Sequence, residues 1–142
     1  MGIRVLVGGS LMHGGGMDAE EFEDHLARFN IDYVASDAGS CDPGPFYLGE
    51  GVPMTHREGL KQALDAMLVG TRRRGIPLLI GSAGIAGRRE QVAVFRDLIL
   101  EIARERELPR FTLACIEADI PKPMVKAALA EGRIARSAPC RR

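Results

Sequence analysis

The chain has 142 residues, of which 46% are hydrophobic and 27% charged, and its 19 basic residues balance its 19 acidic ones. This length fits one domain with a core of ordinary size. The charge balance excludes the strongly basic face of a nucleic-acid-binding protein, and no apolar run approaches the ~18 residues that span a membrane. Three scattered cysteines and the absence of a signal-peptide pattern predict a cytoplasmic protein.

Apolar periodicity divides the first half of the chain into strands and a helix. Residues 3–7 form a short apolar run that ends in glycines, which predicts a buried strand. A helix is predicted from Asp18 to about Phe29, because apolar residues recur at helical spacing and Asp18 with Glu21 resembles a capping box. Residues 33–36 predict the second strand.

The second half of the chain continues the alternation of helices and strands. Thr55 with Glu58 gives another capping-box signal, and the helix that begins there is expected to end before Gly75. The remaining predicted elements are a strand, a long helix, a strand and a short helix, over residues 77–80, 88–107, 111–116 and 123–131.

Four strand–helix units in series predict an α/β fold, a parallel four-stranded sheet with helices on both faces that is Rossmann-like. We expect the strand order 2-1-3-4. In that order the first and third strands are neighbours, and a crevice opens between the loops that follow them. The α/β domain is expected to cover residues 1–134, and residues 135–142 are expected to form an irregular tail.

Two glycine-rich loops follow the first and third strands, an arrangement that can bring backbone N–H groups to an anion. The first leads into an acidic helix start, whereas the second leads into Arg88. A cation at a helix amino terminus opposes the helix dipole, so Arg88 suggests a bound anion or an acidic partner such as Glu90. We expect an anionic small molecule to bind here. The candidate binding residues are Gly9, Ser10, Ser40, Tyr47, Gly81, Ser82, Ala83, Gly84 and Arg88.

The connection over residues 37–54 is the longest in the chain and carries prolines, glycines and an aromatic pair. Asp37 is expected at the carboxyl end of a strand, Asp42 follows in the loop, and His13 lies in the first glycine-rich loop. These three are the candidate catalytic residues, with the carboxylates positioning or deprotonating a substrate. Phe46 and the tyrosine after it are expected to cover the ligand. Neither a metal nor a particular cofactor is assigned.

Two segments also carry a family resemblance. Asp37-Ala-Gly-Ser-Cys-Asp-Pro-Gly-Pro-Phe-Tyr-Leu-Gly49 and Ile76-Pro-Leu-Leu-Ile-Gly-Ser-Ala-Gly84 together resemble the AtuA-like family, which is also catalogued as a domain of unknown function and is named for acyclic terpene utilisation. The resemblance covers most of the chain and implies a cytoplasmic protein linked to the breakdown of citronellol- or geraniol-type acids. Because family members are usually several times longer, it also implies that this chain is the amino-terminal part of a longer protein.

Two classes of function remain open. The first is an enzyme or enzyme subunit that acts on a small carboxylic acid or its acyl-CoA thioester, a substrate class that comes from the resemblance. The second is a non-catalytic ligand-binding or assembly subunit for a larger catalytic partner. Convergence of Asp37, Asp42 and Ser82 in one cleft favours the first. Carboxylates that only cap turns, beside an exposed apolar patch, favour the second.

Self-association is expected in either case. The predicted strand at residues 111–116 is apolar and lies at the edge of the sheet, where an unpaired strand recruits another one. The chain is therefore expected to form a homo-oligomer or to associate with the remainder of the family domain.

Overall fold

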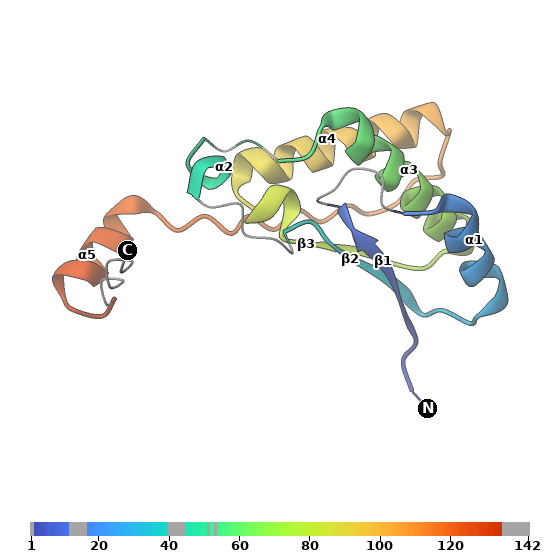
Figure 1. The fold of residues 1–142 in the computed structure, drawn as a ribbon, viewed down its shortest axis with the longest axis horizontal. Helices are drawn as coiled ribbons and strands as arrows, with labels where there is room; N and C mark the ends of the chain where they lie inside the picture. Colours follow the sequence, from blue (N-terminus) through green and yellow to red (C-terminus); the bar gives the residue numbers. More distant parts are fainter. Residues whose placement is uncertain (1, 12–16, 40–44, 51, 53, 135–142) are drawn as a thin grey trace, which may run out of the picture.

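The fold is an α/β arrangement around a small parallel sheet (Figure 1). It comes from a computed structural model that describes residues 2–11, 17–39, 45–50, 52 and 54–134. The strands are β1 (Val5–Ser10), β2 (Tyr33–Asp37) and β3 (Leu78–Gly81). They pair in the order β1-β2-β3, so β2 is central. The predicted order 2-1-3-4 is wrong, because β1 and β3 lie on opposite sides of β2.

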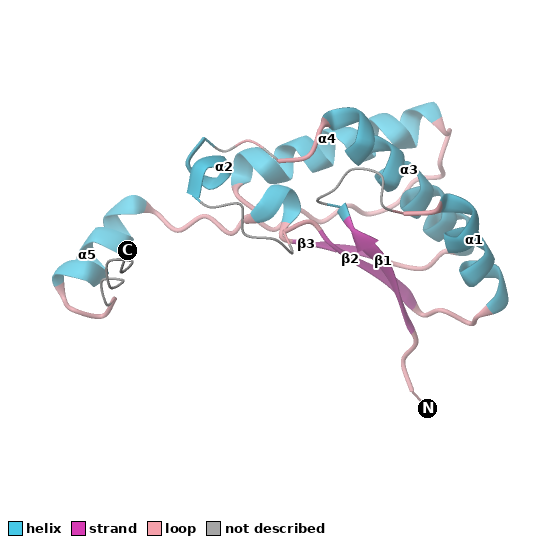
Figure 2. Cartoon of the chain, in the orientation of Figure 1, coloured by secondary structure: helices cyan, strands magenta, loops and turns pink. Residues whose placement is uncertain are grey.

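The strand order decides where the helices lie. The helices are α1 (Ala19–Arg28), α2 (Pro45–Glu50), α3 (Arg57–Arg74), α4 (Arg89–Glu105) and α5 (Lys122–Ala130). Each connection leads to the next strand along the sheet, always in the same direction. Because right-handed connections that run in one direction all pass over the same face of a sheet, their helices lie together on that face. Figure 2 shows α1, α3 and α4 together on that face. The predicted cover on both faces is therefore wrong for the described part of the chain.

The helices follow the predicted periodicity closely. Asp18 caps α1 by accepting hydrogen bonds from the backbone N of Glu20 at 2.9 Å and of Glu21 at 3.1 Å. The predicted capping box at the start of α3 is wrong, because the N-cap of that helix is His56 and no side-chain cap bond is present there. The Thr55 hydroxyl donates to the carbonyl of Leu11 at 3.1 Å. The core lies between the covered sheet face and α1, α3 and α4. It includes Phe22, Leu26, Val34, Leu60, Leu64, Met67, Phe95, Leu98 and Ile102.

The predicted fourth strand does not form in the described structure. Residues 109–121 are extended but belong to no sheet ladder, although Leu113 and Ile116 line the same small cavity as Leu78 and Ile80 of β3. An apolar extended segment looks the same in sequence whether or not a neighbour pairs with it. Beyond this segment the chain runs out to α5, which projects from the body (Figure 1).

Candidate functional site

The turn after β3 is the most strained backbone in the described structure. Ser82 has φ 50° and Ile85 has φ 110°, both in the region that side chains other than glycine rarely adopt. Gly84 and Gly87 lie there as well, with φ 69° and 65°. The turn contains a short 3-10 helix, η2 (Ala83–Ile85). Strain of this kind persists only where surrounding structure holds it, and it often marks a functional segment.

The end of β2 packs directly against this turn. A Cβ added at Gly39 would lie 2.2 Å from the carbonyl oxygen of Ile85 and 2.5 Å from Cβ of Ser82, so only glycine fits. The Asp37 carboxylate accepts a hydrogen bond from the backbone N of Gly39 at 2.9 Å. Asp37 thus caps the turn that brings Gly39 against Ser82.

Gln91 joins this turn to the segment before α3. Its side chain is fully buried. Its Oε1 accepts hydrogen bonds from the backbone N of Ala86 at 3.3 Å and of Arg88 at 3.4 Å, and its Nε2 donates to the carbonyl of Val52 at 3.2 Å. Arg88 adds a hydrogen bond from Nη1 to the carbonyl of Gly49 at 3.4 Å. The predicted long loop is therefore fastened to the start of α4.

The amino terminus of α4 already holds a carboxylate from this chain. Oδ2 of Asp119 accepts a hydrogen bond from the backbone N of Arg89 at 2.6 Å. Glu117 accepts another from Nε of Arg89 at 2.9 Å, and this bond raises the pKa of the Arg89 guanidinium above its ordinary range. A carboxylate satisfies both the free N–H group and the positive end of the helix dipole.

Arg88 also faces acidic partners. Its Nη2 lies 3.3 Å from a carboxylate oxygen of Glu90, and its Nε lies 3.7 Å from Oδ1 of Asp119. Of the two alternatives that the sequence left open at Arg88, the acidic partner is present. The Glu90 partner can be predicted from the sequence because it lies two residues from Arg88. The Asp119 partner cannot be predicted in this way, because a contact between residues 31 positions apart leaves no local sequence pattern.

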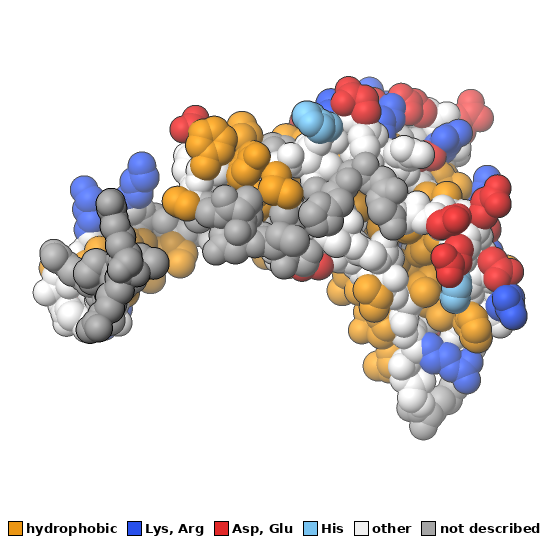
Figure 3. Space-filling view, viewed as in Figure 1, with side chains coloured by type: hydrophobic (Ala, Val, Ile, Leu, Met, Phe, Trp, Pro, Cys, Tyr) orange, Lys and Arg blue, Asp and Glu red, His pale blue; other side chains and the backbone are white. Residues whose placement is uncertain are grey.

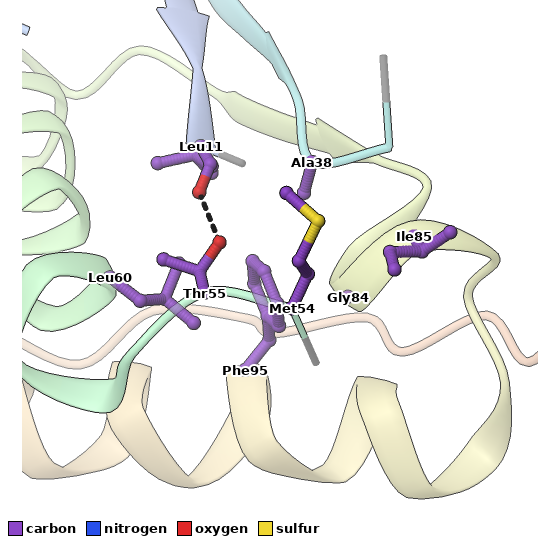
Figure 4. Close-up of a pocket in the computed structure, with 8 residues that line it drawn as sticks. All are labelled: Leu11, Ala38, Met54, Thr55, Leu60, Gly84, Ile85 and Phe95. Atoms are coloured by element: carbon purple, nitrogen blue, oxygen red, sulfur yellow. Dashed lines mark hydrogen bonds between the residues drawn. The ribbon is translucent and has the colours of Figure 1, made fainter. Parts of the chain in front are cut away.

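The loops after all three strands meet around one small cavity. It has a volume of about 10 Å³, roughly the space of one water molecule, and its lining is mostly apolar (Figure 4). Its lining residues are Leu11, Ala38, Met54, Thr55, Leu60, Gly84, Ile85 and Phe95. The expected crevice between the first and third strands is therefore absent from the described structure, because β2 stands between them.

The structure brings together only some of the predicted site residues. Asp37, Ser82, Ala83, Gly84 and Arg88 surround the turn after β3, together with Gly81 at the end of that strand. Gly9 and Ser10 belong to β1, on the other side of the central strand. Tyr47 lies in α2, where its ring packs edge-on against the ring of the exposed Phe46, with centroids 5.2 Å apart. His13, Ser40 and Asp42 lie outside the described residues.

A second candidate site is the uncovered side of the sheet, which we call the open face. Register pairs Val7 with Ala35 and Ala35 with Leu79, so these side chains point to the same face. Val7 is 72% exposed and Leu79 51% exposed. Figure 3 shows hydrophobic side chains at the surface beside β1, on the side away from α1. The prediction that residues 3–7 form a buried strand is wrong for this reason.

These features define a small α/β protein with an open, three-stranded parallel sheet that is covered on one face. Compared with models of protein families, with characterised proteins and with solved structures, the chain matches none of them. None of the helices in the described ranges combines the length and apolar character that crossing a bilayer requires. The same ranges contain no group of three or more acidic, histidine or cysteine side chains placed to hold a metal ion.

Proposed function

We propose that this chain is an assembly module, an α/β unit whose open face packs against another polypeptide. The observation that carries the proposal is the row of apolar residues in which exposed Val7 and Leu79 lie on either side of the half-buried Ala35. All-parallel sheets occur almost only with both faces covered. A parallel sheet with an apolar face in water therefore calls for a second layer, and an exposed apolar patch is typical of a protein interface.

Among the residues that the structure describes, the polar side chains at the strand ends favour assembly over catalysis. Asp37 caps a turn through its bond to Gly39, and Arg88 faces Glu90 and Asp119. The cavity among the strand-end loops holds no more than about one water molecule. The resemblance to the AtuA-like family gives one candidate for the larger partner, a catalytic protein of acyclic terpene or organic acid breakdown.

Substitution on the open face tests this proposal. Val7→Glu places a charge where the proposed interface needs an apolar side chain, and its high exposure means that the isolated fold tolerates the change. Ala27→Glu, at an exposed position on α1, is the matched control. Light scattering after size exclusion should find the unmodified chain and the control associated, and Val7→Glu monomeric. A chain that stays monomeric without substitution, at tens of micromolar and in cell extract, would refute the proposal.

The strained turn after β3 favours a second candidate function. Ser82 and Ile85 hold costly backbone conformations beside Gly84, and such strain is common where a loop binds a ligand. The candidate is an enzyme or enzyme subunit that binds a small carboxylate or acyl-CoA at residues 81–87. If Ser82 donates one hydrogen bond to the ligand, Ser82→Ala should weaken binding about fivefold, or ~1 kcal/mol. Calorimetric titration of CoA and short carboxylates tests it, with the exposed Thr112→Ala as control; equal affinity in Ser82→Ala and the unmodified chain argues against it.

A further inference from the structure

The carboxyl-terminal arm, residues 116–134, has apolar side chains that the sheet of its own chain leaves largely exposed. Ile116 is 84% exposed and Ile120 is 65% exposed. On α5, Met124 is 61% exposed, and Leu129 is also exposed. A helix with exposed apolar side chains is the element that covers a sheet face in α/β proteins.

The base of this arm is fastened to the body of the molecule. The backbone N of Ala118 donates to the carbonyl of Gly87 at 2.9 Å. Asp119 and Glu117 bind the backbone and side chain of Arg89 at the start of α4. Only two residues separate Asp119 from the first residue of α5. With these contacts in place the arm holds α5 away from the sheet of its own chain, as Figure 1 shows.

The same chain therefore carries a sheet face without a helix and a helix without a sheet. We propose, resting on the assembly role proposed above, that α5 of a second copy covers the open face, and that two copies exchange their arms reciprocally. A second copy can cover both surfaces while every contact at the base of the arm is kept. For α5 to pack on the sheet of its own chain, the arm would instead have to reverse its direction and return to the open face.

Reciprocal exchange uses both uncovered surfaces of each chain. Each chain contributes one open face and one arm, so a two-fold pair forms two such contacts and covers the open face and the arm of both copies. Two contacts of ordinary size bury about 1,600 Å² on each chain, the amount that a stable dimer needs. Exchange of an identical element between protomers is a known route to a dimer, and it closes without forming a fibre.

Disulfide trapping between two differently tagged copies tests the proposal. The background replaces Cys41, Cys115 and Cys140 with serine, and one copy carries Met124→Cys. The other copy carries a single cysteine on the open face, in three parallel preparations: Val5→Cys, Val7→Cys and Leu79→Cys. At least one mixture should form a disulfide between the two tags under mild oxidation. A copy with Ala27→Cys on α1 should form none.

A chain carrying both Met124→Cys and an open-face cysteine separates exchange from self-docking. If the arms are exchanged, this doubly substituted chain should also form its disulfide between two copies. A bond formed within single, monomeric chains would overturn the proposal and assign the open face to the chain's own α5. Cross-linking in none of the three mixtures, while the chain remains associated, would overturn it in favour of a different occupant.

Substitution on the arm distinguishes this inference from the assembly role itself. Met124→Glu with Leu129→Glu should raise the dimer Kd at least about tenfold, because a buried unpaired charge is costly. Lys126→Glu, an exposed position on the same helix, is the control for charge and folding. If Val7→Glu abolishes association while the double arm variant does not, the assembly role stands and α5 is not the occupant. If the unmodified chain is already monomeric and neither variant changes its oligomeric state, both proposals fail.

Discussion

Gly39 has no room for a side chain. A methyl group there would overlap the backbone of Ile85 at 2.2 Å, and backbone cannot move aside as a flexible side chain can. We expect Gly39→Ala to lower the free energy of unfolding by about 2–3 kcal/mol, in the range of an overpacked core. Urea denaturation measures this loss.

Gly49→Ala is the matched control for that change. Nothing lies within 4 Å of a Cβ at Gly49, which belongs to α2, so Gly49→Ala should leave the stability of the chain unchanged or raise it by up to about 1 kcal/mol. If the two variants proved equally stable, the turn after β3 would be free to move away from β2.

Asp119 acts as a cap for α4 from a distant part of the chain. Asp119→Ala removes the acceptor for the backbone N of Arg89 and should cost about 1 kcal/mol of stability, as loss of a helix cap does. Asp97→Ala, in an exposed pair with Arg96 on the same helix, should cost less than about 0.5 kcal/mol.

Hydrogen exchange gives Asp119→Ala a second readout. Amides of residues 117–120 should exchange faster in that variant, because Asp119 also fastens the base of the arm. Unchanged exchange there would show that the backbone bond from Ala118 to Gly87 holds the arm alone.

At the scale of elements, a cluster of charges clamps α3 to α4. Glu101 accepts hydrogen bonds from Lys61, at 2.6 Å, and from Arg57, and these bonds lower the pKa of its carboxyl below the ordinary 4.5. Because the folded state binds this proton less readily than the unfolded state, the clamp stabilises the fold above that pH. Its contribution is lost as the pH falls through the lowered pKa.

Glu101→Gln should therefore flatten the acid side of the stability profile. We expect the unmodified chain to be more stable than the variant at neutral pH, and the gap to narrow as the pH falls below the ordinary 4.5 and through the lowered pKa of Glu101. Denaturation across a pH series at fixed protein concentration measures the gap. Glu131→Gln, in an exposed pair with Arg133 just after α5, should leave the profile unchanged. A constant gap at every pH would mean that the clamp acts by packing and not by charge.

Local patterns predicted the elements well and their arrangement poorly. The helices α1, α3, α4 and α5 and the strands β1, β2 and β3 are confirmed, because apolar periodicity and end signals such as Asp18 are encoded within a few residues. The strand order is not local: it depends on which side of β2 the chain takes after α3. The same holds for residues 111–116, since a strand exists only when a partner pairs with it.

The candidate site also combines features that local sequence patterns predict with features that they do not predict. The glycine-rich turn after β3 and its proximity to Arg88 follow from strand–loop–helix logic. Gln91 carries a weak signal, because it stands at the third position of α4, where a glutamine commonly bonds back to the helix start. No signal in the sequence indicates that Val7 is exposed. Apolar residues in a short run predict burial, and only the missing second layer reveals that this face is uncovered.

At the scale of the whole molecule, association should appear in the thermal stability. If partner surface covers the open face, folding is linked to protein concentration, and Tm rises as the chain is concentrated. We expect an increase of about 3–6 °C across a hundredfold range of concentration. Val7→Glu should melt at one temperature throughout, and lower than the unmodified chain at high concentration. A concentration-independent Tm in the unmodified chain would contradict self-association.

The strands occur in the sheet in the same order as in the chain, and this has a consequence for folding during synthesis on the ribosome. Each strand pairs with one that has already been synthesised, so β1, α1 and β2 can assemble before β3 emerges, and the sheet grows in the direction of translation. The sheet is complete at Gly81, whereas α5 ends at Ala130, about fifty residues later. At about 5–20 residues per second, a nascent chain displays its apolar face for several seconds before its own arm exists. During that interval a chaperone, or the finished arm of a chain made earlier on the same message, is the available cover.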